Sequence, residues 1–421
     1  MQDILYRHQR EIVQADPKRT GLFMGTGSGK TRTALMLAEG RTLVIAPKTQ
    51  VEDGNWGREY LHLPTRITEI RVISKETFRR DHLELPGFDT VIVDEAHTCL
   101  GMTANTRRRG GREIPRASQL YEALGAFLSA HRPSRLYLCT ATIVKSPMTV
   151  LAAKWLLRGP SGEAMREFYE FRRDFYTKLP MPGREVWAPK KDQRVKERLA
   201  EMVRSLGYIG RLEDYFDVPA QTFRTVHVGL SEAQEKRLKR LVSEYPEPIV
   251  RIGKRHQVEN GSLAGDEFTA TEFFKSEKVE RILELAEEFP RMVVFAKYRA
   301  QLTQLKIELE KAEYKVLVMN GDTKDRGALL AEANASEACI FLVQAQISAG
   351  WELPQYPVMV FASRTYSFVD YQQALGRILR ANALKKNLYI SLVVRGGVDE
   401  AVDKALENKQ DFDEKLYAEK I

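Results

Sequence analysis

The sequence contains few cysteines and histidines, the residues that form disulfide bonds or bind transition metals. It has three cysteines in 421 residues, Cys99, Cys139 and Cys339, without CxxC spacing, and each lies in or beside an apolar segment. We therefore expect reduced cysteines packed in the interior, with no disulfide and no cysteine-held metal. None of the seven histidines forms an HExxH pattern, which argues against a catalytic zinc site.

Long apolar runs are also missing. No stretch approaches the roughly 18 consecutive apolar residues of a membrane span, and the first ten residues, MQDILYRHQR, contain no signal-peptide core. These absences predict a cytoplasmic protein that does not interact with membranes. At roughly 100–200 residues per domain, the chain is long enough for two or three domains with large hydrophobic cores.

Positive charge is present in modest excess. The chain has 65 Lys and Arg residues against 57 Asp and Glu residues, a formal net charge of +8 at pH 7. The whole excess lies in residues 1–225, because residues 226–421 are slightly acidic. A polyanion is therefore a candidate partner.

Short apolar runs alternate with helical spacing near both ends of the chain. This alternation predicts an α/β fold with two doubly wound parallel sheets, in domains of residues 1–150 and 220–421. Between them, residues 151–219 combine basic and aromatic residues with helical spacing, which predicts a basic helical extension and linker. The predicted buried strands are residues 42–47, 89–94, 135–142, 291–296, 314–320, 338–343 and 356–363.

A glycine-rich segment, FMGTGSGKT (residues 23–31), predicts a phosphate-binding loop. Glycines let backbone N–H groups approach phosphate oxygens, and the following helix adds positive potential at its N-terminus. Lys30 would reach the β- and γ-phosphates, and Thr31 would bind Mg²⁺. Met24 replaces the first glycine of the strict pattern. The expected ATP contacts in this loop are Gly25, Thr26, Gly27, Ser28, Gly29, Lys30 and Thr31.

An acidic pair follows a buried strand in VIVDEAH (residues 91–97). Carboxylates at the carboxyl end of a parallel strand lie where α/β proteins bind ligands. Asp94 would hold Mg²⁺, partly through water, and Glu95 would orient and deprotonate the attacking water. His97 is either a structural histidine or a link between the nucleotide site and the second domain.

A QxxGRxxR pattern lies near the end of the chain. Arg377 and Arg380 are three residues apart, so on a helix they share a face, and Gln373 precedes them by one turn. One interpretation is a surface helix with solvated arginines. The other is that both arginines reach the ATP phosphates, with Gln373 positioning water, because an arginine supplied by a separate domain makes hydrolysis depend on domain closure.

Taken together, these motifs resemble the superfamily 2 helicases and translocases, most closely the Swi/Snf-type branch with its DEAH box. Several segments resemble motifs of this family, in the same order. LYRHQ (residues 5–9) offers Gln9 as the adenine contact, APK (residues 46–48) offers Pro47 and Lys48 to nucleic acid, and VISKETF (residues 72–78) resembles the segment that follows. The resemblance also assigns coupling to His97, Thr140 and Thr142, and nucleotide contacts to Gly350 and Glu352.

The resemblance implies two RecA-like domains with ATP and Mg²⁺ between them and nucleic acid lying across both. Glu352 and residues 142–147 depart from the Swi/Snf pattern. The implied activity is that of an ATP-dependent DNA helicase or translocase with a nucleic-acid-stimulated ATPase. The alternatives are a nucleotide-switched DNA-binding or strand-annealing protein that does not unwind, and an RNA helicase. We expect a monomer that acts on single-stranded or duplex DNA in a bacterial cell or a phage-infected host.

Two further segments are candidates for nucleic-acid contact. NTRRRGGREIPR (residues 105–116) predicts a flexible loop in which Arg107, Arg108, Arg109 and Arg112 contact phosphates, the alternative being a solvated surface loop. Residues 246–268 contain an Asn-Gly turn signal, which suggests a hairpin that touches nucleic acid. The aromatic residues of the 151–219 segment fit a helical core better than strand stacking.

Overall fold

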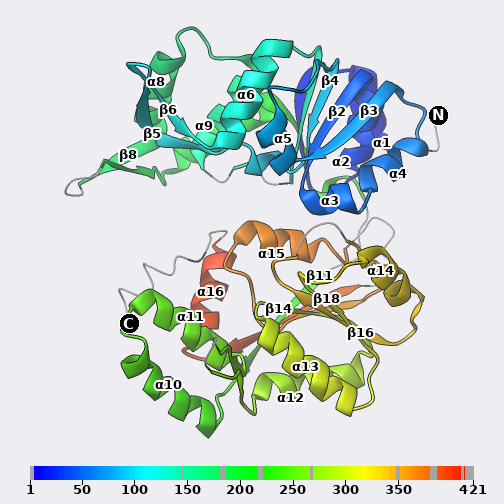
Figure 1. The fold of residues 1–421 in the computed structure, drawn as a ribbon, viewed down its shortest axis with the longest axis vertical. Helices are drawn as coiled ribbons and strands as arrows, with labels where there is room; N and C mark the ends of the chain where they lie inside the picture. Colours follow the sequence, from blue (N-terminus) through cyan, green and yellow to red (C-terminus); the bar gives the residue numbers. More distant parts are fainter. Residues whose placement is uncertain are drawn as a thin grey trace. The chain divides into compact units, whose positions relative to one another are not determined.

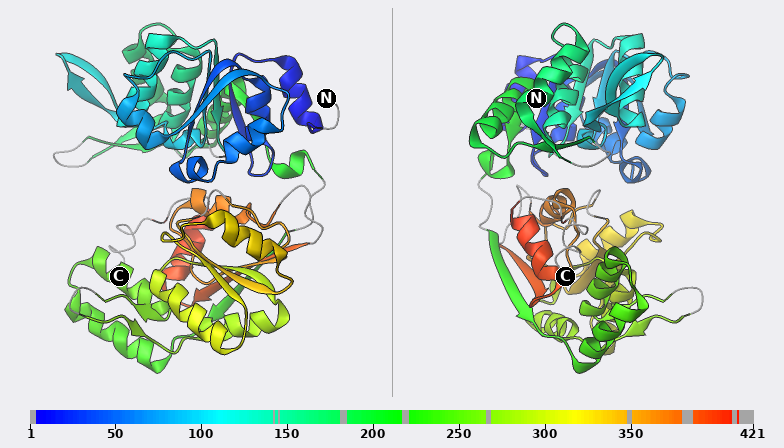
Figure 2. Two further views of the ribbon diagram at one scale, coloured as in Figure 1. Left: turned by 45° about the vertical axis from the view of Figure 1, so that its right-hand side comes forward. Right: turned by 90° about the vertical axis from the view of Figure 1, so that its left-hand side faces the viewer.

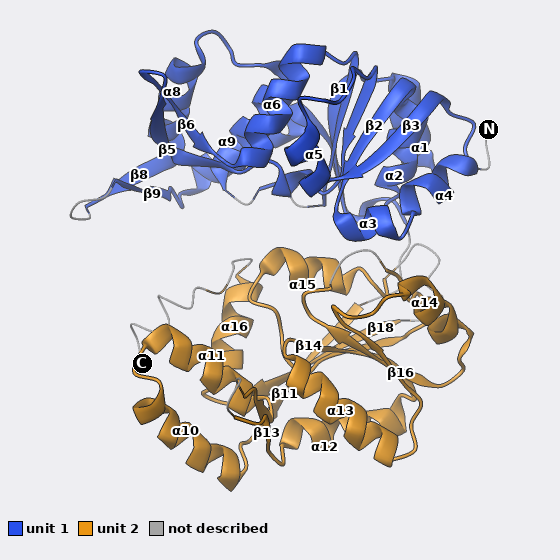
Figure 3. Ribbon diagram, viewed as in Figure 1, with its two compact units in different colours: residues 1–216 blue, residues 217–421 orange. Residues whose placement is uncertain are grey.

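The computed structural model describes residues 4–141, 143–144, 146–180, 185–216, 221–265, 269–347, 351–379, 386–408 and 412. The chain divides into two compact units, unit 1 (residues 1–216) and unit 2 (residues 217–421), each described by itself (Figure 3). Residues 151–216, expected as an extension between the domains, therefore belong to unit 1.

Unit 1 is built on a six-stranded parallel sheet with the strand order β10-β1-β7-β4-β2-β3. The predicted runs at residues 42–47, 89–94 and 135–142 correspond to β2, β4 and β7. Residues 207–210, which lie in the expected extension, form the edge strand β10 beside β1. The strands are β1 (Arg19–Met24), β2 (Glu39–Ala46), β3 (Arg66–Ser74), β4 (Thr90–Val93), β7 (Arg135–Cys139) and β10 (Gly207–Gly210).

Helices cover both faces of this sheet (Figure 1). Along β2, Leu43 and Ile45 face one hydrophobic cluster whereas Val44 and Ala46 face another, as alternation along a buried strand requires. The prediction of a doubly wound sheet is thus confirmed. The helices are α1 (Arg7–Ala15), α2 (Lys30–Leu37), α3 (Lys48–Glu52), α4 (Asn55–Leu61), α5 (Lys75–Asp81), α6 (Gln119–His131), α7 (Pro147–Arg158), α8 (Ala164–Phe175) and α9 (Gln193–Leu206).

Two antiparallel hairpins project from the body of unit 1 (Figure 2). They are β5 (Met102–Arg109) with β6 (Arg112–Ala117), and β8 (Tyr176–Leu179) with β9 (Val186–Pro189). The prediction of a flexible loop at residues 105–116 is therefore wrong. Gly110 and Gly111 both adopt positive φ, +56° and +76°, and so form the tight turn that joins two paired strands.

Unit 2 is built on a second six-stranded parallel sheet, with the order β11-β18-β17-β14-β16-β15. Along β14, Val293 and Phe295 face one cluster and Met292 and Val294 the other. This sheet is also covered on both faces, which confirms the second predicted doubly wound sheet. The strands are β11 (Gln221–Val228), β14 (Arg291–Ala296), β15 (Val316–Met319), β16 (Cys339–Gln344), β17 (Val358–Phe361) and β18 (Asn387–Val394).

The segment that follows β11 differs from the predicted hairpin. Pro248 starts a helix at residues 248–259, because proline is compatible with the first helical turn, and Asn260 and Gly261 then turn the chain into a two-residue strand. The remaining elements of unit 2 are α10 (Glu232–Glu244), α11 (Pro248–Glu259), β12 (Ser262–Leu263), β13 (Glu272–Phe273), α12 (Glu277–Glu288), α13 (Arg299–Lys311), α14 (Arg326–Ala335), α15 (Phe368–Leu375) and α16 (Val398–Glu407).

The expectation that the cysteines pack in the interior is confirmed, because Cys99, Cys139 and Cys339 are all buried. In the part of the chain that the structure describes, no helix is both long and apolar enough to cross a membrane.

Candidate nucleotide site and nucleic-acid surface

The predicted motifs of unit 1 follow successive strands of one parallel sheet. The glycine-rich loop follows β1, Thr140 follows β7, the Asp94–Glu95 pair follows β4, and Pro47 follows β2. The carboxyl ends of parallel strands share one edge of a sheet, which is where open α/β sheets bind ligands. Segments separated by more than 100 residues thus converge on one edge.

The glycine-rich loop has the backbone that phosphate binding needs. Gly27 and Gly29 have φ values of +78° and +81°, and Gly29 is the N-cap of α2. A Cβ atom at Gly29 would lie 2.0 Å from the Gln9 amide nitrogen, so no other residue fits there without displacing Gln9. The Lys30 ammonium lies across the loop and donates to the carbonyls of Met24 and Gly25, at 2.9 and 3.0 Å.

Two residues of helix α1 form hydrogen bonds with the backbone of this loop. The buried Gln9 donates to the carbonyl oxygens of Ser28 and Gly29, at 3.4 and 3.2 Å, and accepts from the Tyr6 amide at 2.9 Å. His8, which the sequence interpretation missed, places Nε2 at 2.9 Å from the Ser28 oxygen and stacks on Tyr215. The His-Gln pair was the available signal, but only its glutamine was assigned a role.

The two acidic residues are both buried. Asp94 accepts from the Glu95 amide at 2.8 Å and from Trp56 Nε1 at 3.4 Å, so the buried Trp56 also contacts the acidic pair. Burial, and then the negative charge of Glu95, raise the pKa of Asp94. Burial alone would also raise the pKa of Glu95, but His97 and the Lys30 ammonium outweigh it and hold that pKa below its ordinary value.

His97 lies between β4 and β7 inside unit 1. Its Nδ1 atom is 2.8 Å from Thr140 Oγ1 and 3.3 Å from Glu95 Oε2. The structure therefore brings three predicted residues together: the acidic Glu95, the histidine and the threonine of the coupling motif. Thr142, the other threonine of that motif, lies outside the described residues.

Lys75 is a second residue that the sequence interpretation missed. It is buried at the start of α5, and its ammonium donates to the Glu95 carbonyl at 2.9 Å and to Thr98 Oγ1 at 2.6 Å. Its charge also lowers the pKa of both Asp94 and Glu95. The signal in the sequence was a lysine directly after the buried end of β3, within the VISKETF segment.

Arg377, the first arginine of the predicted pair, is placed differently from the expectation. Helix α15 ends at Leu375, before Gly376, so Arg377 lies beyond the helix and not on its face. The buried Arg377 guanidinium donates to the Gln373 carbonyl, in the last turn of α15, and to the Trp351 carbonyl, both at 3.0 Å. An arginine that satisfies free carbonyls at a helix end in this way ties α15 to the Trp351 segment.

The other predicted residues of this region are only partly described. Gln373 is buried in α15, and Glu352 is exposed between the buried Trp351 and Leu353. Gly350 and Arg380 lie outside the described residues.

The predicted arginines of the hairpin β5–β6, called here the arginine hairpin, differ in whether they form ion pairs. Arg107 and Arg109 both pair with Glu122 of α6. Within the described part of the chain, neither Arg108 nor Arg112 has an ion-pair partner. Arg109 and Arg112 stand directly opposite each other next to the glycine turn. Like charges opposed in this way are unfavourable, which is consistent with a surface kept for an anion.

The predicted residues Pro47 and Lys48 lie at the same sheet edge as the acidic pair. Pro47 is the N-cap of α3, and the exposed Lys48 is 3.6 Å from Glu52 one turn further along that helix.

The residues at this edge fit Mg²⁺-ATP by their chemistry. The loop offers backbone N–H groups at a helix N-terminus together with the Lys30 ammonium, a set suited to phosphate oxygens. Thr31 and Asp94 offer the oxygen atoms that Mg²⁺ prefers. Glu95 Oε2 is buried, makes no hydrogen bond within the described structure and lies 3.3 Å from His97 Nδ1.

Comparison with known proteins adds information on unit 2. Residues 275–382 match the family described as the helicase conserved C-terminal domain. Among solved structures, the chain is similar to the "Sulfolobus solfataricus SWI2/SNF2 ATPase core in complex with dsDNA", with 16% sequence identity and a TM-score of 0.39. That comparison covers 99% of this chain and 92% of the other. None of the curated proteins matches the chain.

Proposed function

We propose that this protein is a superfamily 2 motor of the Swi/Snf type that couples ATP hydrolysis to movement along DNA or to its unwinding. The observation that carries the proposal is the edge of the unit 1 sheet, where the phosphate loop, Lys30 and the buried Asp94–Glu95 pair come together. The helicase C-terminal match in unit 2 supports a motor over other kinds of ATPase.

In this proposal each residue of the unit 1 site has a separate role in binding or hydrolysing ATP. The loop amides and Lys30 bind the phosphates, and Gln9 with His8 keeps the loop in its left-handed turns. Thr31 and Asp94 hold Mg²⁺, which neutralises the charge of the phosphates when bound. Glu95 accepts a proton from the attacking water, since its lowered pKa keeps it an ionised acceptor. His97 connects this carboxylate to Thr140 of the coupling motif, and Thr142 is proposed to take part in the same coupling.

Unit 2 supplies the remaining groups. Arg377 and Arg380 are proposed to stabilise the γ-phosphate, with Gln373 positioning water and Gly350 and Glu352 contacting the nucleotide. Through its two carbonyl contacts, Arg377 connects α15 to the Trp351–Leu353 segment. This segment carries Glu352, so Arg377 also fits a role in fixing the position of Glu352. Arg377→Ala should therefore weaken both nucleotide turnover and the stability of this segment.

DNA is the proposed nucleic-acid partner. Pro47 and Lys48 lie at the ATP edge of unit 1, and the arginine hairpin supplies exposed positive charge through Arg108 and Arg112, with Arg107 and Arg109 beside them. Contacts of this type are independent of sequence and weaken as salt is raised. Replacing Arg108 and Arg112 with alanine should lower the log–log salt slope of DNA binding by about 0.9 for each lost phosphate contact. The matched control is Glu122→Gln, which frees Arg107 and Arg109 and should not weaken binding.

The deciding experiment measures ATP turnover alone and with single-stranded DNA, duplex DNA or RNA, with Lys30→Ala as the inactive control. Stimulation by DNA that is lost in Lys30→Ala supports the proposal. Stimulation by RNA alone would identify an RNA helicase. ATP binding without stimulated turnover would identify a nucleotide-switched binding or annealing protein.

A further inference from the structure

We propose that Lys75 is a positioning residue for ATP hydrolysis, which fixes the backbone of Glu95 so that its carboxylate faces the reacting water. The inference rests on the proposed function, because it assumes that Glu95 acts at ATP. It adds a residue that none of the motifs assigns, and it rests on three hydrogen bonds to one carbonyl group.

Glu95 needs such support because its backbone is strained. It is a non-glycine residue with φ +42° and ψ +51°, in the left-handed region, and it is the N-cap of the short 3₁₀ turn Ala96–Thr98. L-residues other than glycine rarely adopt this conformation, and those that do are held in it by their surroundings. If the backbone relaxed, the carboxylate would turn away from Asp94 and Lys30.

The Glu95 carbonyl is the group that is held. It accepts from the Thr98 amide at 3.1 Å, from Thr98 Oγ1 at 2.9 Å and from the Lys75 ammonium at 2.9 Å. The ammonium also donates to Thr98 Oγ1 at 2.6 Å, so lysine, threonine and carbonyl form a closed triangle. Two of the three donors belong to the same turn as Glu95. Of the three donors to this carbonyl, Lys75 is the one that comes from another element, α5.

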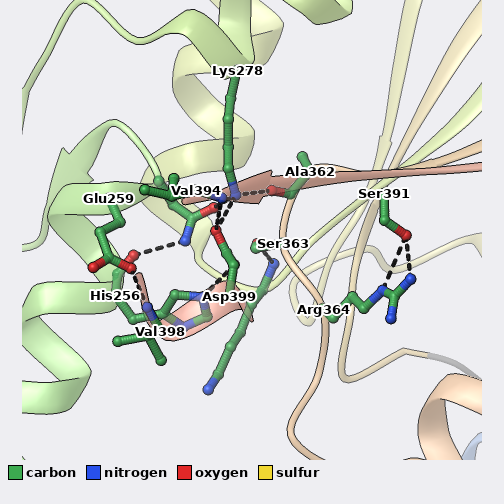
Figure 4. A network of polar contacts seen from close by, with 12 residues as sticks. His256, Glu259, Lys278, Ala362, Ser363, Arg364, Ser391, Val394, Val398 and Asp399 are labelled. Carbon is green, nitrogen blue, oxygen red and sulfur yellow. Dashed lines mark hydrogen bonds and ion pairs between the residues drawn. The ribbon is translucent and has the colours of Figure 1, made fainter. Parts of the chain in front are cut away.

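The charge on Lys75 indicates that this anchor serves more than stability. Lys75 is 7% exposed, and no carboxylate of the described residues lies within ion-pair distance of its ammonium. Burying an ammonium group against neutral oxygens costs free energy of folding. A residue that is kept despite such a cost, without a compensating contact nearby, is a candidate for a functional role. Lys278 of unit 2 is buried as deeply but pairs with Asp399 at 2.7 Å (Figure 4).

The variant that tests the proposal is Lys75→Met, which keeps the length of the side chain and removes its charge and its donors. The Glu95 carbonyl keeps both bonds from Thr98, and Ser74 still caps α5 by accepting from the Thr77 amide. No buried charge is left unpaired, so the variant is expected to fold.

Two further variants keep the test falsifiable. Ser74→Ala removes the cap of the same helix while leaving the Lys75 ammonium in place, so it reproduces a purely structural loss. Thr98→Val removes one of the two side-chain donors to the Glu95 carbonyl. If Lys75→Met does not fold, the proposal is tested with Thr98→Val instead.

The readouts are kcat for ATP hydrolysis in the presence of DNA and the dissociation constant of a fluorescent ATP analogue. We expect Lys75→Met to lower kcat about 100-fold, as misplacement of a reacting group by about 1 Å does, with nucleotide affinity changed less than about twofold. Thr98→Val should show the same selective loss of kcat at smaller size, and Ser74→Ala should leave kcat near the parent value.

A parent-like kcat in Lys75→Met, or an equal loss in Ser74→Ala, would overturn the inference. If Lys75→Met does not fold, an unchanged kcat in Thr98→Val would overturn it instead. Failure of the proposed function itself is recognised separately, because Glu95→Gln would then hydrolyse ATP at the parent rate.

Discussion

The carboxyl edges of the two sheets use buried charge in opposite ways. In unit 2, the Lys278 ammonium is neutralised by Asp399 and donates to the Ala362 carbonyl at 2.6 Å (Figure 4). It also donates to the Asn260 side-chain oxygen at 2.6 Å. In unit 1, the hydrogen bonds of the Lys75 ammonium within the described residues go to a carbonyl and a hydroxyl oxygen. The first arrangement pairs the buried ammonium directly with a carboxylate, whereas in the second the ammonium acts on the acidic pair through its charge, without a direct ion pair.

The same contrast holds for the acidic residues. Asp399 accepts from Lys278 and lies 2.8 Å from His256, which in turn contacts the hydroxyl groups of two tyrosines. Asp94 and Glu95 are neighbouring carboxylates, and one of their oxygens makes no hydrogen bond. Networks that are fully satisfied rigidify a core, and sites with unsatisfied charge are where ligands bind. The comparison therefore assigns stability to the edge of unit 2 and chemistry to the edge of unit 1.

The largest expected effect is on stability in unit 2. Lys278→Met leaves Asp399 buried without its ammonium partner and should destabilise unit 2 by about 3–5 kcal/mol. Hydrogen exchange of peptides from each unit at increasing urea would measure this loss. The matched control is Lys306→Met, which breaks an exposed pair with Glu310 and should cost at most about 1 kcal/mol. Equal losses of unit 2 stability in the two variants would contradict the structural role assigned to the buried Lys278.

An intermediate effect is expected from acid. Burial alone would raise the pKa of Asp399, but Lys278 and His256 hold it below its ordinary value of 3.8. Because the folded-state pKa is the lower one, the stabilisation is complete above the unfolded-state pKa and is lost as pH falls below it. Unit 2 should therefore lose stability progressively as pH falls below about 5. In Asp399→Asn this part of the pH dependence should be absent, and its persistence would contradict the assignment.

The smallest effect on stability is expected at Lys75. Lys75→Met removes hydrogen bonds to neutral oxygens, and the Glu95 carbonyl keeps both of its bonds from Thr98, so unit 1 should lose only about 1 kcal/mol. The same urea and hydrogen-exchange measurement on unit 1 peptides checks this value. A loss as large as that of Lys278→Met would show that both lysines are structural and would remove the distinction between the two edges.

The sequence predicted the elements whose signals are local. Runs such as Val91–Val93 are apolar on both faces and can only be buried strands, and the GSGKT segment carries its own turn and helix start. The acidic pair was predictable because it directly follows one of these strands. The order of motifs along the chain also anticipated that they would meet at one edge.

The features that sequence reasoning missed depend on contacts between distant segments. The charge of Lys75 suggests solvent exposure, and only the packing of α5 against the 3₁₀ turn, 20 residues further along, shows that it is buried. Residues 105–116 were also predicted as a flexible loop, although the double glycine was a hairpin signal. For Arg377, the helix expected from QxxGRxxR ends early because Gly376 favours termination.

The central claim is that the acidic pair of unit 1 hydrolyses ATP, and the most direct test is DNA-stimulated ATP turnover by Glu95→Gln. Glutamine keeps the size of the side chain but cannot accept the proton from water. We predict that turnover falls by about 10²- to 10⁴-fold while a fluorescent ATP analogue still binds. Turnover near the parent rate would contradict the account.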